Sequence, residues 1–216
     1  MELLSRPTSW IVLCAVACGL LLWSEYRTWR PGIWSFKLLA SSAFVATALG
    51  AGALDSGYGR FVLCGLALCW LGDLLLIPER SETAFLAGIG SFLLGHVAYA
   101  IAFWTLPLSG LGLALAGVAI AGLGALVLRW LRPHLTGIFR AAVPAYVAVI
   151  GVMLATAMAT FVAGSSPAIA IGALLFAVSD LSVARNRLVQ ADFATVAWGL
   201  PLYFAGQLFL ATSVAG

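Results

Sequence analysis

Two aspartates and one histidine lie inside long apolar runs of this sequence, where ionisable groups are costly. Asp73 and Asp180 each precede the end of an apolar run by about four residues, and His96 lies in the middle of another run. Ionisable groups in such positions usually belong to a proton relay, an ion path or a catalytic site. Two carboxylates in a low-dielectric layer can share one proton, so that one acts as an acid while the other carries a negative charge. These residues therefore predict acid–base chemistry in an apolar setting.

The two aspartates are expected at the same depth. Each lies roughly 6 Å inside the end of its helix, and the two helices run in the same direction. Lys37 begins another helix on that side, which places an ammonium group in the same layer. His96 is expected roughly 18–20 Å along its helix from that side, deeper than the carboxylates. A simpler interpretation is that each aspartate caps a helix or pairs with a basic loop residue, as Asp180 could with Arg187.

Two helices carry polar groups on one face. The helix that contains His96 has a stripe within an arc of roughly 60°, made of Phe85, Gly88, Phe92, His96, Tyr99 and Phe103. The last helix spaces Gly199, Tyr203 and Gln207 four residues apart. A tyrosine or glutamine in lipid needs a hydrogen-bond partner, so both faces are expected to point inward. Packing between helices is the alternative explanation of both stripes, and a hydrogen bond to a neighbouring helix would equally explain the histidine.

Composition restricts the class of protein to one that lies in a membrane. Hydrophobic residues make up 63 % of the 216 residues, charged residues only 9 %, and the mean hydropathy is +1.08. A soluble domain carries about 25 % charged residues, so a soluble enzyme and a disordered regulator are excluded. The net charge of +3 is too small and too scattered for a nucleic-acid-binding surface. The apolar runs are continuous rather than alternating, which excludes a transmembrane barrel.

The chain is therefore predicted to be an all-α, polytopic integral membrane protein, with one membrane-embedded domain over residues 1–216. A spanning helix needs roughly 20 mostly apolar residues. Eight segments qualify, and they are Trp10–Trp23, Trp34–Ala51, Arg60–Ile77, Thr83–Leu106, Ser109–Trp130, Phe139–Ala163, Pro167–Ala184 and Phe193–Val214. The first segment could instead be a signal peptide, but its basic region is thin and no small-residue cleavage site follows, so we expect it to remain a helix.

The basic residues are concentrated on one side of the predicted helices. Nine of the 11 Lys and Arg residues lie at the loops after the first, third, fifth and seventh helices, namely Arg27, Arg30, Lys37, Arg80, Arg129, Arg132, Arg140, Arg185 and Arg187. The other two are Arg6 and Arg60. The positive-inside rule then places these loops in the cytoplasm and both termini outside, across the cell (inner) membrane if the chain is bacterial.

A faint internal similarity relates the two aspartate motifs. Gly72-Asp73-Leu74 and Ser179-Asp180-Leu181 are each followed by a charged turn and a helix that carries an inward tyrosine. The motifs lie four helices apart, a shift that preserves the direction of the helix. This predicts a parallel 4+4 repeat.

The cysteines point to packing rather than to a metal site. Cys14, Cys18, Cys64 and Cys69 all fall inside helices, where a thiol usually acts as a small apolar group. A zinc site would need histidines or carboxylates beside them. We therefore expect no metal and no cofactor.

These polar residues together resemble the YhhN family of membrane proteins, which includes the transmembrane lysoplasmalogenases. The resemblance rests on Gly72-Asp73, the stripe from Phe85 to Phe103, Ser179-Asp180 and Tyr203-x3-Gln207. It covers the second to the eighth helix, and Gly-Asp together with His-x2-Tyr is its most specific part. Family members usually have Lys-Pro at the start of the second helix, whereas Lys37 is followed here by Leu38.

The resemblance implies hydrolysis of the vinyl ether bond of a lysoplasmalogen to a fatty aldehyde and a glycerophospho-choline or -ethanolamine. This reaction needs an acid that protonates the β-carbon, a negative charge beside the resulting oxocarbenium ion, a water molecule and an apolar slot. Asp73, Asp180 and His96 are the expected catalytic residues. The expected substrate-binding residues are Lys37, Phe85, Phe92, Tyr99, Ser179, Tyr203 and Gln207. Lys37, Arg185 and Arg187 are expected near the phosphate.

The expected partners are this lysophospholipid and the membrane lipid, with no nucleic acid. A proton-coupled transporter or channel would also use intramembrane aspartate and histidine, although neither aspartate helix has a clear break at its carboxylate. An intramembrane aspartyl protease needs Gly-x-Gly-Asp, and Trp70 occupies the place of the first glycine. A lipid-packing protein without enzymatic activity is the third alternative.

Overall fold

The computed structural model describes residues 7–78 and 81–215, and these contain eight helices that are long and apolar enough to cross a membrane. They are α1 (Pro7–Tyr26), α2 (Arg30–Gly50), α3 (Gly57–Leu76), α4 (Glu82–Trp104), α5 (Gly110–Leu131), α6 (Phe139–Val162), α7 (Pro167–Ala184) and α8 (Phe193–Thr212). A π-helical segment, Arg185–Val189, continues α7, and short 3-10 turns follow α5 and α8. No strand occurs in this described part of the chain. The prediction of an all-α multi-pass membrane protein is confirmed.

Local sequence explains where most helices begin. Ser56, Ser81 and Ser109 each accept a hydrogen bond from the backbone N–H three residues later, which satisfies a donor that the first turn leaves free. Asp192 caps α8 in the same way through the Thr195 N–H. Pro167 opens α7, where the missing N–H costs nothing.

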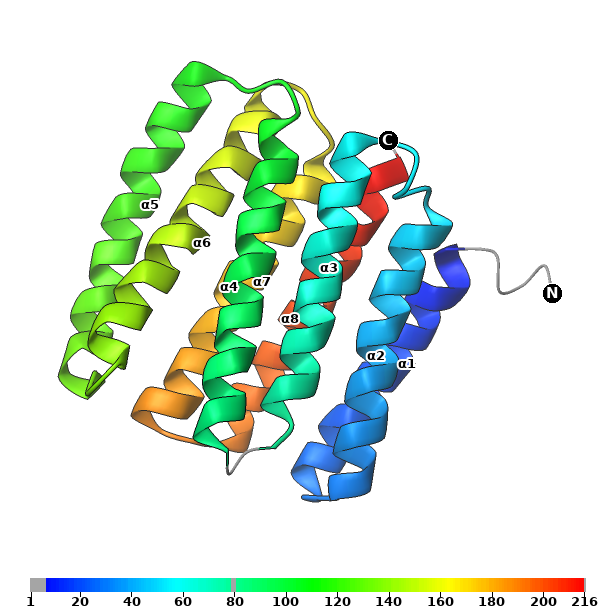
Figure 1. The fold of residues 1–216 in the computed structure, drawn as a ribbon, viewed down its shortest axis with the longest axis vertical. Helices are drawn as coiled ribbons and strands as arrows, with labels where there is room; N and C mark the ends of the chain where they lie inside the picture. The colour runs from blue at the N-terminus through cyan, green and yellow to red at the C-terminus, as the bar shows by residue number, and fades with distance from the viewer. Residues whose placement is uncertain (1–6, 79–80, 216) are drawn as a thin grey trace.

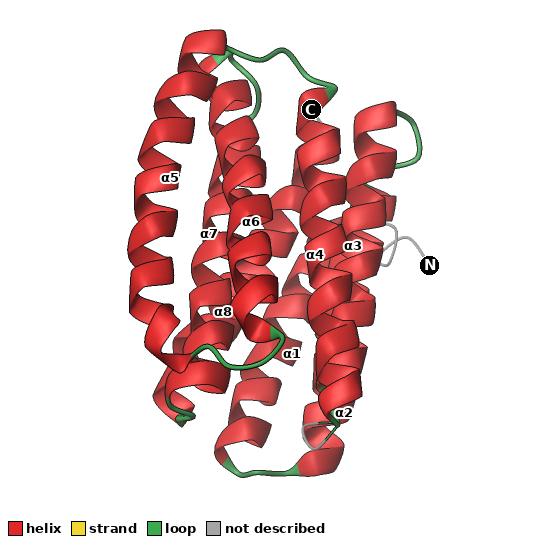
Figure 2. Ribbon diagram, turned by 60° about the vertical axis from the view of Figure 1, so that its left-hand side comes forward, coloured by secondary structure: helices red, strands yellow, loops and turns green. Residues whose placement is uncertain are grey.

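The helices are arranged as a ring with one helix outside it. In the order α1, α2, α3, α4, α6, α7 and α8, each helix packs on the next, and α8 closes the ring on α1. α8 also contacts α2 and α3, so it packs across the ring as well as along it. α5 lies at the edge of the bundle and packs against α6 (Figure 1). Figure 2, seen from another side, shows α5 again as an outer helix.

Aromatic side chains fill the interior of the ring. Phe44 and Phe176 are fully buried, and Phe92, Tyr203 and Phe204 are nearly so. Tyr203 contacts the rings of the other four, with centroid separations from 4.9 to 6.2 Å. These edge-on and tilted contacts join α2, α4, α7 and α8 around one centre.

The loops after α1, α3, α5 and α7 lie at one end of the bundle, and the start of α1 and the end of α8 lie at the other (Figure 1). The described basic residues that were predicted to share a side therefore do so, with Arg60 at the opposite end. Arg6 and Arg80, which belong to the same prediction, fall outside the described residues. Which end faces the cytoplasm stays a prediction.

Candidate active site

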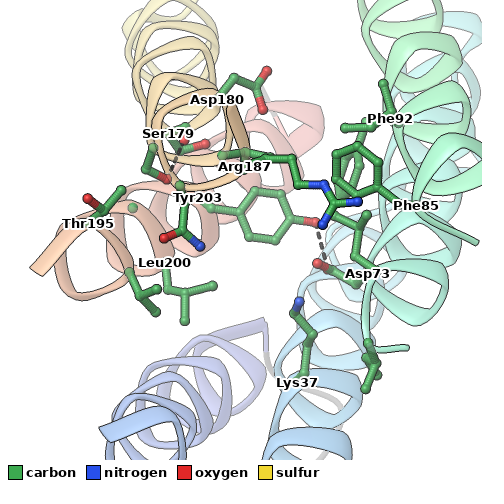
Figure 3. Close-up of a pocket in the computed structure, with 18 of the residues that line it drawn as sticks. Lys37, Asp73, Phe85, Phe92, Ser179, Asp180, Arg187, Thr195, Leu200 and Tyr203 are labelled. Atoms are coloured by element: carbon green, nitrogen blue, oxygen red, sulfur yellow. Dashed lines mark hydrogen bonds between the residues drawn. The ribbon is translucent and has the colours of Figure 1, made fainter. Parts of the chain in front are cut away.

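A polar cavity of about 380 Å³ lies between the ends of α2, α3, α4, α7 and α8, toward the end of the bundle with the basic loops (Figure 3). Its wall carries three carboxyl groups, Glu25, Asp73 and Asp180, and two basic groups, Lys37 and Arg187. Aromatic surface comes from the neighbouring helices. The cavity therefore combines acids, bases and apolar walls in one volume.

Asp73 is held by hydroxyl groups from two other helices. Ser41 of α2 donates to its Oδ2 at 2.5 Å, and Tyr203 of α8 donates to the same oxygen at 2.7 Å. The residue is 3 % exposed, and these hydrogen bonds offset the cost of burying a carboxyl group. The ammonium group of Lys37 points toward Asp73 (Figure 3). This setting suits a negative charge in contact with the cavity.

Gly72 explains how α4 comes so close to this carboxyl group. A Cβ atom at Gly72 would lie 2.7 Å from the ring of Phe92, so only glycine leaves room for that ring. Phe92 packs directly on α3 and shares the cavity wall with Asp73. In the Gly72-Asp73 pair, the glycine therefore allows α4 to pack closely on α3, and the aspartate supplies the polar group.

Asp180 has a different environment. Its Oδ2 lies 3.1 Å from Nε2 of His96 on α4, and the Tyr146 hydroxyl of α6 donates to the same oxygen at 3.3 Å. The imidazole is fully buried and stacks on Phe176 at 4.2 Å between centroids. Asp180 itself is 12 % exposed, so it is the member of this pair that reaches the cavity.

The hydrogen bond at Nδ1 of His96 indicates which tautomer a neutral imidazole adopts here. Nδ1 of His96 lies 2.7 Å from the carbonyl oxygen of Phe92, and since a carbonyl only accepts, Nδ1 carries a hydrogen. A neutral imidazole then has a lone pair on Nε2, which lies 3.1 Å from Oδ2 of Asp180. Within the described residues, Nε2 has no partner that is aligned as a hydrogen bond. If Asp180 were ionised, its carboxylate would repel that lone pair. A single proton shared by His96 and Asp180 would remove this repulsion, whichever atom held it.

The basic residues divide into two groups. Lys37 and Arg187 reach the cavity, and the Arg187 guanidinium lies 4.2 Å from the centre of the Phe85 ring. Arg185 instead donates to Asp192 at 2.6 Å and to Thr195, which ties the π-helical segment to the start of α8. These contacts make Arg185 a structural residue, and they leave Lys37 and Arg187 as the cations that can meet an anionic group.

Most of the residues predicted from the sequence come together here, but not all. Lys37, Asp73, Phe85, Phe92, Ser179, Asp180 and Tyr203 line the cavity, and His96 lies directly behind Asp180. Tyr99 and Gln207 do not line it, since the Tyr99 hydroxyl donates to Gln207 Oε1 at 2.5 Å and both side chains are fully buried. Ser179 donates to the Phe176 carbonyl oxygen at 2.6 Å, which engages its hydroxyl within α7.

The depth of Asp180 and the identity of two partners differ from expectation. Because the Arg185–Val189 segment prolongs α7, Asp180 lies about 13 Å from the end of the continuous helix rather than 6 Å. Asp180 lies beside His96, which was expected to be deeper than either carboxyl group. Ser41 was missed, although it follows Lys37 by four residues and so shares its helical face. The contact of Tyr146 with Asp180 was likewise not predicted from the sequence. No group of three His, Cys, Asp or Glu side chains able to hold a metal ion occurs among residues 7–78 and 81–215.

Comparison with known proteins supplies independent information. The model of the YhhN family matches residues 32–214. The chain is 35 % identical to Lysoplasmalogenase TMEM86A of Bos taurus over 158 residues, which are 70 % of this chain and 64 % of the relative. It is 32 % identical to a Lysoplasmalogenase of Mycobacterium bovis over 167 residues, 72 % of this chain and 61 % of the relative. The chain thus matches somewhat less than two thirds of the length of these relatives. No solved structure matches it.

Proposed function

Because the chain belongs to the YhhN family, and because its relatives carry the name lysoplasmalogenase, we propose that it hydrolyses the vinyl ether bond of a lysoplasmalogen. The products would be a fatty aldehyde and a glycerophospho-choline or -ethanolamine. The observation that carries the proposal is the 3.1 Å contact between His96 and Asp180 at the wall of a cavity that Asp73 also lines. We propose that this pair holds one proton. Vinyl ether hydrolysis needs a proton donor and a separate negative charge.

Asp180 is the proton donor in this proposal and His96 is its positioning residue. Of this pair, only Asp180 reaches the cavity, so the shared proton passes from its carboxyl group to the β-carbon of the vinyl ether. The carbon attached to the ether oxygen then becomes an oxocarbenium ion. His96 cannot touch the substrate, and it acts by holding Asp180 and by sharing the charge that remains on the pair.

Asp73 is the negative charge and the base. Its carboxylate stabilises the oxocarbenium ion and accepts a proton from the water that adds to the ion, which gives a hemiacetal. The hemiacetal hydroxyl returns a proton to the Asp180–His96 pair while the bond to the glycerol oxygen breaks, and Asp73 gives its proton to that oxygen. The net change is the addition of one water molecule, and both acids regain their initial states.

The polar end of the cavity suits the head group. Lys37 and Arg187 line its wall near the end of the bundle with the basic loops, and an Arg or Lys side chain binds a phosphate through charge-assisted hydrogen bonds. The aromatic rings of Phe85 and Phe92 cover the remaining wall. A substrate with a phosphate at one end and a vinyl ether further in therefore matches the order of these groups.

The proposal is tested by the release of aldehyde from the purified, membrane-reconstituted protein. A lysoplasmalogen should give aldehyde, and the saturated-ether analogue with the same head group and chain should give none. Asp73→Asn should lower the rate by about 10²–10⁴-fold, the range for removal of an acid–base or electrostatic group. Asp55→Asn, an exposed aspartate in the loop at the opposite end of the bundle, is the matched control and should retain the parental rate. A folded parent protein that releases no aldehyde, or an Asp73→Asn protein as fast as the control, would contradict the proposal.

A further inference from the structure

A second cavity of about 290 Å³ lies between α5, α6 and α7, with the start of α4 at one end. Its wall is aliphatic over most of its length, and residues such as Ile120, Val147, Ile150 and Leu154 supply the surface. The polar side chains in it are Tyr146, Asp180 and Arg187. Each of these three also lines the polar cavity of the candidate active site. The two cavities therefore adjoin at the carboxyl group that we propose as the proton donor.

The apolar cavity continues deeper into the bundle from this junction. Along α6, Gly151 lies roughly 7 Å beyond Tyr146 and Leu154 roughly 12 Å beyond it, at the rise of an α-helix. It also opens sideways, because Leu123 of α5 and Leu174 of α7 line it and are 61 % and 53 % exposed. α5 packs chiefly on α6, so lipid surrounds the outer wall of the cavity. A hydrocarbon chain in the bilayer thus has lateral access to Asp180.

We infer that the substrate's single alkyl chain lies in this apolar cavity, between α5, α6 and α7. The vinyl ether then lies at Asp180, and the head group fills the polar cavity. The inference rests on the proposed function for the identity of the lipid. It is carried by the continuity of the two cavities at Asp180 and Tyr146 and by the change from polar to aliphatic walls at that point. A two-part volume of this kind matches an amphiphile with one chain.

The inference makes Gly151 and Val178 determinants of chain length. Both line the apolar cavity, from α6 and from α7, and a Cβ at Gly151 would meet Ile120 at 3.4 Å, an ordinary contact. Gly151→Leu and Val178→Phe should each fill the deep part of the cavity from opposite walls. Gly122→Leu is the matched control, because Gly122 is on α5, outside the cavity, with open space around its Cβ position.

The experiment compares kcat/KM for vinyl ether substrates with chains of about 16 and about 8 carbons. A buried methylene contributes about fourfold, from about 0.8 kcal/mol each, so the parent should prefer the longer chain. Gly151→Leu and Val178→Phe should lower the ratio of long-chain to short-chain kcat/KM by at least about tenfold, the effect of displacing about two methylenes. Gly122→Leu should leave the ratio unchanged. A ratio unaltered in both cavity variants would overturn the inference and leave the proposed function intact.

A photo-cross-linking measurement tests the inference independently of catalysis. A saturated-ether lysophospholipid with a photoreactive group at the end of its chain should cross-link to residues 120–127 and 147–154 in the parent and in Gly122→Leu. The labelling should fall in Gly151→Leu. Cross-links on α1, α2 or α3 would place the chain elsewhere and refute the inference. Equal labelling by a long-chain alcohol probe without a head group would show only a lipid-facing crevice, which also refutes it. Correct labelling with no aldehyde release would instead refute the proposed function alone.

Discussion

Replacing Asp180 by asparagine separates the shape of the proposed acid from its proton. Nδ1 of His96 donates to the Phe92 carbonyl group, so neutral His96 offers a lone pair at Nε2, 3.1 Å from the Asp180 oxygen. An asparagine amide N–H can donate to that lone pair. The Tyr146 hydroxyl, which contacts the same oxygen at 3.3 Å, can then no longer donate there, but its oxygen can accept the second amide N–H. Asp180→Asn therefore keeps both neighbours paired while it removes the proton that the pair could transfer.

The expected effect is large on catalysis and small on folding. Loss of a general acid lowers a rate by about 10²–10⁴-fold. The free energy of unfolding should change by less than about 1.5 kcal/mol, because the hydrogen bonds at the site are replaced rather than lost. Initial rates of aldehyde release and thermal unfolding in the same membrane mimetic would give both values for the parent and the variant.

His96→Gln provides the comparison that distinguishes donor from positioning residue. Since the imidazole is fully buried behind Asp180, its loss should reduce kcat less than Asp180→Asn does. It should also change the pH–rate profile, because Asp180 then loses the group with which it shares a proton in the proposed mechanism. If Asp180→Asn releases aldehyde at a rate within about threefold of the parent, far outside the range for a lost general acid, the proton-donor argument is wrong.

Two further predictions concern residues outside the cavity. Tyr99→Phe should lower the free energy of unfolding by roughly 1–3 kcal/mol, because buried Gln207 then loses its hydrogen bond at Oε1 and its Nε2 already has no hydrogen-bond partner among the residues that the structure describes. Thermal unfolding should show that adding Gln207→Leu restores most of the loss. Hydrogen bonds from Thr195, and then Arg185, lower the pKa of Asp192 to about 2 from 3.8. The contribution of Asp192 to local stability should thus be complete above pH 3.8 and disappear as the pH falls through about 2; hydrogen exchange of residues 185–192 should show this dependence, and Asp192→Asn should abolish it.

The helices could be predicted from the sequence because each is a continuous apolar run bounded by turn residues. Serine caps at positions 56, 81 and 109 reinforce the starts of three of them. The end of α7 was the exception. Arg185-Asn186-Arg187 has the composition of a loop, yet the backbone continues as a π-helix through Val189. The continuation depends on the contacts of Arg185 with Asp192 and Thr195, which the local sequence does not reveal.

The contents of the site were predictable to the extent that helical periodicity selects a face. The stripe on α4 correctly points inward, since Phe92, His96, Tyr99 and Phe103 are all buried. Periodicity does not say where along that face a cavity ends. Phe85 and Phe92 line the cavity, whereas Tyr99, about two turns beyond Phe92, packs over Gly65 of α3. That boundary is set by packing between helices distant in sequence.

The contacts of the two aspartates follow the same plan four helices apart. Asp73 of α3 is contacted by Ser41 of the preceding helix and by Tyr203 of the last helix of the second half. Asp180 of α7 is contacted by Tyr146 of its preceding helix and by His96 of the last helix of the first half. A shift of four helices converts one set of positions into the other, as a parallel 4+4 repeat would require. The residue types break this symmetry, because Tyr203 supplies a hydroxyl donor where His96 supplies a titratable imidazole. In the proposed mechanism, one of these two related positions would hold its carboxyl group as a negative charge and the other as half of a proton-sharing pair, which is the asymmetry that acid–base chemistry on two carboxyl groups needs.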